Sequence, residues 1–168
     1  TNTDETVHEN ELPAEYVMRI ADKKNKNVGK DYEDLVLSAD TVIAVGRRIL
    51  NKPKDTTEAR KFLDLLSGRR HKVMTGVCLF ARGKYYRRLV KTTLRMKRLS
   101  DLEKKNYLTS QEWRERSGGY AIQGKAAYFF PFISGSYSNI VGLPLTETVG
   151  LLNGVGYQQS ILLPAGSS

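Results

Sequence analysis

Hydrophobic positions in the first part of the chain change from helical to extended spacing. Residues 12–24 predict a helix, because small and apolar side chains recur three and four positions apart and Pro13 suits a first helical turn. Residues 25–34 are polar and predict a loop. Residues 35–45 form an apolar run rich in β-branched side chains that ends at Gly46, which predicts a central strand covered on both faces.

The middle of the chain predicts a second helix followed by a pair of strands. Over residues 55–66 the apolar positions keep helical spacing, with Asp55 placed to cap the helix and Glu58 placed to complete a capping box. Residues 71–80 alternate between apolar and polar positions, which predicts a half-buried strand. A turn that contains glycine then leads to a returning strand over residues 85–97.

Shorter elements are predicted in the last third of the chain. A second capping box at residues 100–103 opens a short helix that reaches about Tyr107. The glycine-punctuated stretch 118–142 contains a strand-like segment at residues 128–130 and a hairpin at residues 134–136.

A final helix is predicted to open at Pro144, because proline suits a first helical turn. Its inward-facing residues are then Leu145, Val149 and Leu152. No repeat or linker separates the predicted elements. Together they predict an α/β fold, with one domain over residues 1–153 and a C-terminal tail over residues 154–168.

Composition places the chain among ordinary soluble globular proteins. It has 168 residues, 40% hydrophobic and 27% charged, which suffices for one well-buried domain and excludes general disorder. No apolar stretch approaches the roughly 20 residues of a membrane-spanning helix, and the polar first ten residues do not predict a signal peptide. The single cysteine, Cys78, excludes an internal disulfide framework and favours a reducing, cytoplasmic setting.

An excess of basic residues makes an anionic partner a candidate. Lysine and arginine number 27 against 18 acidic residues, a formal net charge of +9, which suits nucleic acid, a membrane surface or a phosphorylated small molecule. The basic residues are scattered, and no zinc-finger or aromatic nucleic-acid-binding motif accompanies them. A solvated surface explains the same charge, so net charge alone does not choose the partner.

Three polar features are candidates for chemistry. Asp40 lies inside the apolar run, where a carboxylate is costly unless it is paired or bound to a cation. It is either a metal ligand or general base at a strand end, or an acid that ends the strand and caps a turn. Lys52 is either a phosphate-binding lysine near a helix N-terminus or a surface lysine. Gln123, in the glycine-flanked segment 118–124, offers a donor and an acceptor to a base edge, although the glycines also suit simple turns.

Other reactive side chains are isolated in the sequence. His8 and His71 have no partner at the spacing of a metal site, so neither is expected to bind zinc. Cys78 lies in a predicted strand and is expected to be a small buried residue rather than a nucleophile. Trp113 and the tyrosines are expected to pack in the core.

In order along the chain, several segments resemble the Maf family of nucleoside triphosphate pyrophosphatases. The resemblance covers roughly residues 1–153, and its motifs follow one another at the family's separations. They are Ser38-Ala39-Asp40-Thr41, Lys52-Pro53-Lys54-Asp55 with Glu58-Ala59, the run from Leu65 to Val77, the segment Gly118-Gly119-Tyr120-Ala121-Ile122-Gln123-Gly124, and the run from Gly135 to Thr148.

The resemblance implies a fold, a reaction and a set of site residues. The fold is an elongated mixed sheet flanked by helices, related to the inosine triphosphate pyrophosphatases. The reaction cleaves a nucleoside triphosphate to monophosphate and pyrophosphate with a divalent cation, Mg²⁺ or Mn²⁺. The motif around Gln123 resembles the branch that acts on dTTP and UTP. The implied site residues are Asp40 as catalytic and metal-binding, Glu5 as metal- and substrate-binding, Lys24 and Lys52 at the phosphates, and Thr41 and Gln123 for base specificity.

The sequence departs from the family pattern in two places. Family members begin with a strand and a Ser-x-Ser-Pro-Arg-Arg phosphate-binding motif, and no such motif stands before Glu5. We therefore expect that the first strand and phosphate loop are missing from this sequence. Arg116-Ser117 also stands where the family usually has Lys-Ala, which alters the phosphate side of the site.

Two functional hypotheses follow from these residues. The first is a cytoplasmic pyrophosphatase whose partner is a nucleoside triphosphate, rather than nucleic acid or a membrane, with a homodimer left open. The alternative is a catalytically weak nucleotide- or nucleic-acid-binding protein linked to cell-division control, which the net charge and the missing arginine loop motivate. A purely structural dimerisation domain has no positive feature in its favour.

Overall fold

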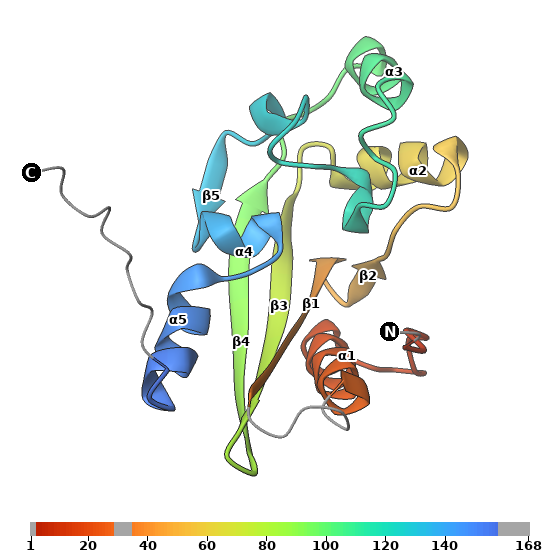
Figure 1. The fold of residues 1–168 in the computed structure, drawn as a ribbon. Coiled ribbons are helices and arrows are strands. Elements are labelled where there is room, and N and C mark those ends of the chain that lie inside the picture. The colour runs from red at the N-terminus through yellow and green to blue at the C-terminus, as the bar shows by residue number, and fades with distance from the viewer. Residues whose placement is uncertain (1–2, 29–34, 158–168) are drawn as a thin grey trace, which may run out of the picture.

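The computed structural model describes residues 3–28 and 35–157 (Figure 1). Five strands form one sheet in the order β2-β1-β3-β4-β5. The elements are α1 (Pro13–Val28), β1 (Leu35–Val45), β2 (Arg48–Leu50), α2 (Thr56–Leu66), β3 (Arg70–Ala81), β4 (Lys84–Arg95), α3 (Asp101–Thr109), the 3-10 helices η1 (Ser117–Gly119) and η2 (Ala127–Phe129), β5 (Phe132–Ser134), α4 (Tyr137–Val141) and α5 (Leu145–Gly154).

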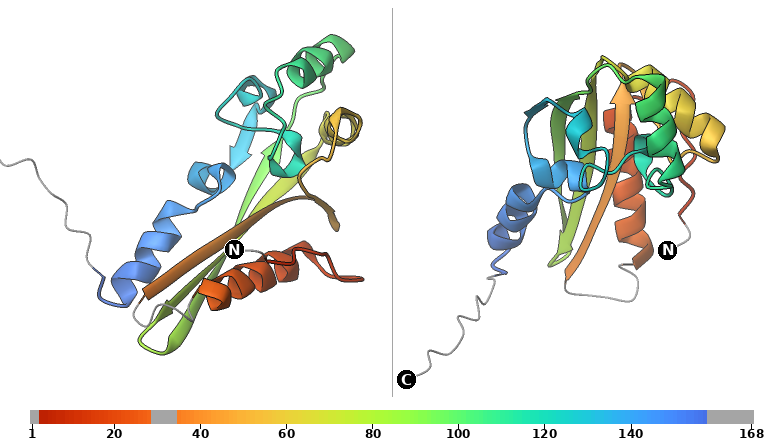
Figure 2. Two further views of the ribbon diagram at one scale, coloured as in Figure 1. Left: turned by 45° about the vertical axis from the view of Figure 1, so that its right-hand side comes forward. Right: turned by 90° about the horizontal axis from the view of Figure 1, so that it is seen from above.

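The α/β class and the elongated sheet flanked by helices are confirmed. Figure 2 shows α1 along one face of the long strands and α4 and α5 along the other, with α2 and α3 near one end. The resemblance implied a mixed sheet. All the strand pairs among the described residues are antiparallel. No helix in the described ranges is long and apolar enough to cross a membrane.

Alternation along β1 divides the core between the two faces. Val42 and Ala44 pack with Tyr16 and Val17 of α1 in one cluster. The residue between them, Ile43, faces the opposite side and joins the larger cluster under α2 and α3. Consecutive burial of these residues confirms the prediction of a strand covered on both faces, for this part of β1.

One glycine in β3 lets α1 approach the sheet closely. Gly76 pairs with Asp40 of β1 in the antiparallel register. A Cβ atom at Gly76 would lie 2.7 Å from the carbonyl oxygen of Val17 and 3.0 Å from the Met18 sulfur. The helix backbone therefore packs directly over the strand beside Asp40.

Both predicted N-cap residues cap their helices, but only one of the two predicted capping boxes is complete. Asp55 accepts a hydrogen bond from the Glu58 amide at 2.7 Å and caps α2, but the Glu58 carboxylate accepts from the amide of Lys54 rather than Asp55. The second box is complete, because Ser100 and Glu103 each accept from the other's amide. Both predicted helices thus begin where the sequence placed them.

Two predictions in the first half were wrong. The segment 25–34 is not all loop, because α1 continues to Val28; residues 29–34 lie outside the described residues. The buried Asn25 amide donates to the carbonyl oxygens of Val36 and Cys78 at 2.8 and 2.9 Å, which holds this extra turn on the sheet. The strand β3 is not half-buried, since helices cover both of its faces and every residue from 73 to 79 is buried.

Later predictions failed where tertiary contacts decide the backbone. Residues 127–129 form η2 instead of the strand predicted at 128–130, because the Phe129 amide bonds back to Ala126. Residues 134–136 do not form a hairpin, because Ser136 caps α4 instead.

The last helix begins as predicted after Pro144 but turns a different face inward. It buries Thr148 and Leu151 and leaves Leu145 exposed, while Val149 and Leu152 are partly buried. The predicted return strand ends at Arg95, two residues early. Of the predicted tail, residues 158–168 lie outside the described residues.

Candidate active site

Two hollows meet at the free edge of β1. The strand β2 pairs with β1 only from Ile43 to Val45, so no described strand covers that edge before Ile43. One hollow, of about 250 Å³, contains Asp40, and the other, of about 560 Å³, contains Gln123. Thr41 and Ser117 line both hollows. Alternation sends Asp40 and Thr41 to opposite faces, so a ligand that crosses this edge can contact both.

Asp40 occupies the middle of β1 and neither ends the strand nor caps a turn, which corrects both placements expected from sequence. Its side chain is 11% exposed, and Oδ1 accepts a hydrogen bond from Lys24 Nζ at 2.6 Å. Burial raises the pKa of Asp40, and the Lys24 ammonium opposes that rise. A carboxylate held this way is a candidate proton acceptor.

Lys24 lies one helical turn before the end of α1 and joins two carboxylates. Its Nζ atom is 2.6 Å from Asp40 Oδ1 and 2.7 Å from Glu5 Oε1. Burial lowers the pKa of Lys24, but the bonds to both acids outweigh burial and the net shift is upward. Ser38 Oγ donates to the carbonyl oxygen of Ala21 at 2.7 Å, which ties β1 to the turn of α1 that precedes Lys24.

This pair of acids suits a hard divalent cation. Two carboxylates facing one ammonium leave one negative charge without a partner in the group, and Mg²⁺ is commonly bound by one or two carboxylates together with substrate phosphates. Across the described residues no group of three or more His, Cys, Asp and Glu side chains could hold a metal. Asp40 and Glu5 could thus supply two carboxylate ligands to a cation, with further ligands left to come from a phosphorylated molecule.

Lys52 follows β2 and lines the same hollow as Asp40. Its Nζ atom forms an exposed ion pair with Glu115 Oε2 at 3.1 Å. The α2 N-terminus that was expected to help bind a phosphate lies elsewhere, because Asp55 and Thr57 line a different hollow. Lys52 thus offers a point charge to the site without the help of that helix end.

Residues 120–124 of the glycine-flanked segment 118–124 wall the larger hollow. Gly118 has a φ of +67°, and a Cβ atom there would lie 2.7 Å from Ile43 Cδ1, so a side chain does not fit. Gln123 is exposed at this wall. The amide of Ala121 donates to Tyr107 Oη at 3.2 Å, which anchors the segment to α3.

Thr41 and Ser117 form the junction between the hollows. The Thr41 hydroxyl lies 2.8 Å from that of Thr75 and 3.2 Å from the carbonyl oxygen of Gly142. Ser117, at one departure from the family pattern, donates from Oγ to the carbonyl oxygen of Thr41 at 3.3 Å. The substituted serine therefore fixes the 118–124 segment against β1.

Sequence reasoning missed the role of His71. Its Nε2 atom lies 2.8 Å from Tyr120 Oη, and both side chains are buried beside Phe130. Burial lowers the pKa of His71 to about 4, so the ring is neutral near pH 7. In the alternating pattern of β3, the odd-numbered side chains share one face, and His71 is among them. This pattern is the sequence signal that could have suggested a packed histidine.

The expectation that the tyrosines pack in the core is confirmed for Tyr16, Tyr107 and Tyr120 and is wrong for five exposed ones, Tyr85, Tyr86, Tyr128, Tyr137 and Tyr157. The expectations for Cys78 and Trp113 are confirmed. Cys78 and Trp113 are buried. Burial raises the pKa of the Cys78 thiol to about 12, which keeps it protonated and unreactive.

Comparison with known proteins identifies the family. The family model described as Maf-like protein matches residues 1–155, and the chain belongs to this family. Similar proteins named dTTP/UTP pyrophosphatase occur in Roseobacter denitrificans, with 50% identity over 92% of this chain and 82% of the relative, and in Cereibacter sphaeroides, with 51% identity over 91% and 80%. A third, from Chelativorans, is 46% identical over 98% of this chain and 82% of its own length.

The buried histidine predicts a pH dependence of stability. His71 has a folded-state pKa of about 4, against 6.5 for the free side chain, so the unfolded chain takes up this proton first. The neutral His71 side chain contributes its full share to the free energy of unfolding above pH 6.5. This contribution, about 3 kcal/mol at most, is lost as the pH falls to 4. Urea unfolding of His71→Gln should show a correspondingly weaker loss of stability over this range.

The matched control is His8→Gln, at an exposed histidine. This variant should keep the pH dependence of the wild-type protein. An unchanged dependence in His71→Gln would contradict the assignment of a buried neutral ring.

Proposed function

We propose that this protein hydrolyses dTTP and UTP to the nucleoside monophosphate and pyrophosphate. The observation that carries the proposal is the union of two hollows at Thr41, one holding the Asp40–Lys24–Glu5 group and the other walled by Gln123. Membership of the Maf family and the relatives named dTTP/UTP pyrophosphatase support the same activity.

At the phosphate end, Asp40 acts as the general base. A water molecule attacks the α-phosphorus, Asp40 takes its proton, and the bond to the pyrophosphate oxygen breaks. Burial raises the pKa of Asp40, and the Lys24 ammonium opposes that rise, so the ion pair favours the ionised carboxylate that a general base requires. Asp40 and Glu5 would hold a divalent cation, Mg²⁺ or Mn²⁺, which when bound offsets the charge of the triphosphate.

Lys52 and Lys24 supply further positive charge to the phosphates. The Lys52–Glu115 pair is solvent-exposed, and such pairs contribute only about 0–1 kcal/mol. A triphosphate carries several negative charges and therefore displaces Glu115 at little cost. Lys24 lies between the two acids and lines the same hollow. In the proposed complex its ammonium therefore contacts the phosphates from the α1 side of β1.

At the other end, Gln123 reads the pyrimidine edge. A glutamine amide presents one acceptor and donors in one plane, which complements the N–H and carbonyl groups of uracil or thymine. Ile43 and Tyr120 line the same hollow and provide apolar surface for the ring. Thr41, which the resemblance implies as a second specificity residue, lines both hollows, and we place the sugar beside it, between the base and the phosphates.

Nucleic acid binding is the weaker candidate. Several of the basic residues form ion pairs with acidic side chains rather than an open basic stripe; they are Arg19, Lys23, Lys24, Lys52, Arg60, Arg87, Lys97 and Lys104. No separate observation favours this function. A cytoplasmic location, a homodimer and the domain limits 1–153 stay predictions of the sequence.

Removal of the Asp40 charge tests the catalytic assignment. Asp40→Asn keeps the shape of the side chain but cannot accept the proton or bind a cation well. Pyrophosphate release from dTTP should fall by roughly 10²- to 10⁴-fold in kcat, the usual worth of a general base. The measurement is a coupled pyrophosphate assay at saturating dTTP and Mn²⁺.

The control is Asp101→Asn, at an exposed acid in the first turn of α3. Both variants are compared by thermal unfolding to confirm that they fold. Full turnover by a folded Asp40→Asn protein would refute the assignment.

Truncation of Gln123 tests the specificity assignment. Gln123→Ala removes one or two hydrogen bonds to the base, which should lower kcat/KM for dTTP and UTP relative to dATP by about tenfold or more. Lys125→Ala, at an exposed position in the next turn, is the matched control and should keep the preference. An unchanged ratio in Gln123→Ala would remove its role in specificity.

A further inference from the structure

The carboxylate of Glu5 belongs to a segment with no regular structure of its own. Residues 3–8 form neither helix nor strand, and the Glu5 side chain is about half exposed. Asp40, the other acid of the site, is held by the β1 ladder. A carboxylate on an irregular segment needs other contacts to keep a fixed position.

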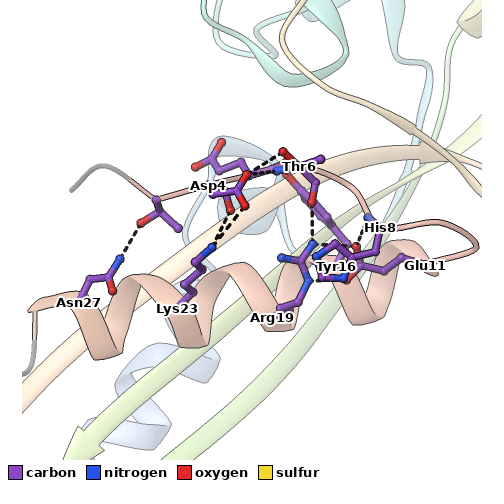
Figure 3. Close-up of polar contacts among 10 residues, drawn as sticks. Asp4, Thr6, His8, Glu11, Tyr16, Arg19, Lys23 and Asn27 are labelled. Atoms are coloured by element: carbon purple, nitrogen blue, oxygen red, sulfur yellow. Dashed lines mark hydrogen bonds and ion pairs between the residues drawn. The ribbon is translucent and has the colours of Figure 1, made fainter.

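Side chains from α1 supply those contacts (Figure 3). Tyr16 Oη donates to the carbonyl oxygen of Glu5 at 3.0 Å, and Arg19 Nη2 donates to that of Thr6 at 2.9 Å. Lys23 Nζ donates to the carbonyl oxygen of Asp4 at 3.3 Å. These donors are spaced three and four residues apart and so lie on one face of the helix. Three successive backbone carbonyls, at residues 4, 5 and 6, are thus bound by successive turns of α1.

Tyr16 is the most firmly held of these donors. Its side chain is buried, at 2% exposure, and packs with Val17, Val42 and Ala44. Burial raises the pKa of Tyr16 to about 12, so the hydroxyl keeps its proton and remains a donor at neutral pH. The phenol therefore joins the core between α1 and β1 directly to the backbone of Glu5.

Arg19 is fixed from a second direction. Its Nε and Nη2 atoms donate to the two carboxylate oxygens of Glu11, at 2.6 and 2.8 Å, and Nη2 also donates to the carbonyl oxygen of Thr6. The bond to Arg19 lowers the pKa of Glu11 to about 2, so the pair stays ionised over the range in which the protein is handled. Arg19 thus holds the segment at Thr6, just after Glu5, whereas Lys23 holds it at Asp4, just before Glu5.

We propose that Tyr16 is a positioning residue of the active site, because its hydroxyl holds the Glu5 backbone so that the Glu5 carboxylate stays beside Lys24 and Asp40. The inference rests on the proposed function for the role it gives Glu5. It goes beyond that function by assigning a role to a buried hydroxyl that does not itself contact the substrate. The mechanism predicts that loss of this one hydroxyl loosens the cation-binding carboxylate and leaves the general base in place.

The test is Tyr16→Phe, which removes the hydroxyl and keeps the buried ring. Binding of Mn²⁺ is measured by the electron spin resonance signal of the free ion, with thymidine α,β-imido-triphosphate present as a nucleotide that is not cleaved. Mn²⁺ should bind roughly 3- to 10-fold more weakly, the usual effect of losing one hydrogen bond that orients a metal ligand. Turnover of dTTP should fall at low Mn²⁺ and recover at saturating Mn²⁺.

A double-mutant cycle separates positioning from a general structural effect. If Tyr16 acts through Glu5, then Tyr16→Phe should have no further effect on Mn²⁺ binding in a Glu5→Gln background. Tyr86→Phe, at an exposed tyrosine of β4, should bind Mn²⁺ like the wild type. Equal Mn²⁺ binding by Tyr16→Phe and wild type, or an equal loss in both backgrounds, would overturn the proposal.

Hydrogen exchange gives a readout that does not depend on turnover. Within residues 4–8, the amides of Thr6 and His8, which donate to the carboxylates of Asp4 and Glu11, should exchange about threefold faster or more in Tyr16→Phe, while those of β3 stay unchanged. If wild-type protein releases no pyrophosphate from dTTP, the proposed function fails, and the exchange result still decides whether Tyr16 holds the segment. Unchanged exchange at residues 4–8 would overturn the inference even in an active enzyme.

Discussion

The ion pair between Asp40 and Lys24 is the interaction on which the site depends. A carboxylate inside a buried strand is costly, and Lys24 Nζ at 2.6 Å offsets that cost. The contact requires α1 to lie close over the sheet, which Gly76 permits because it has no side chain between the helix and the strand. Lys24 also forms an ion pair with Glu5, so one side chain of α1 holds both acids close together.

This pair lies at the free edge of β1 and lines the hollow in which we propose that the phosphates bind. Asp40 faces α1 and lines only the smaller hollow, whereas the next residue, Thr41, lines both hollows. We propose that a nucleotide crosses this edge, with its phosphates and its base on opposite faces of one sheet. The larger hollow is in turn shaped by side chains that buried contacts anchor, such as Tyr120 through its bond with His71.

Local signals predicted the elements well, and long-range contacts explain what they missed. Capping residues such as Asp55 and Ser100 act within one turn, so their helices were predicted close to their observed starts. The extension of α1 past Lys24 depends on Asn25, whose amide bonds to two strands distant in sequence. Asp40 stood out as an acid in an apolar run, but its pairing with Glu5 came only from the family resemblance. The bond from Tyr16 to Glu5 has no sequence signature, because it joins a core side chain to an irregular backbone.

The central claim is that one nucleotide spans the edge of β1, and a crystal structure of the chain with thymidine α,β-imido-triphosphate and Mn²⁺ tests it most directly. We expect the cation between Asp40 and Glu5, the sugar beside Thr41 and the thymine against Gln123. A nucleotide bound away from Asp40, or with its phosphates at the α2 N-terminus, would contradict the account.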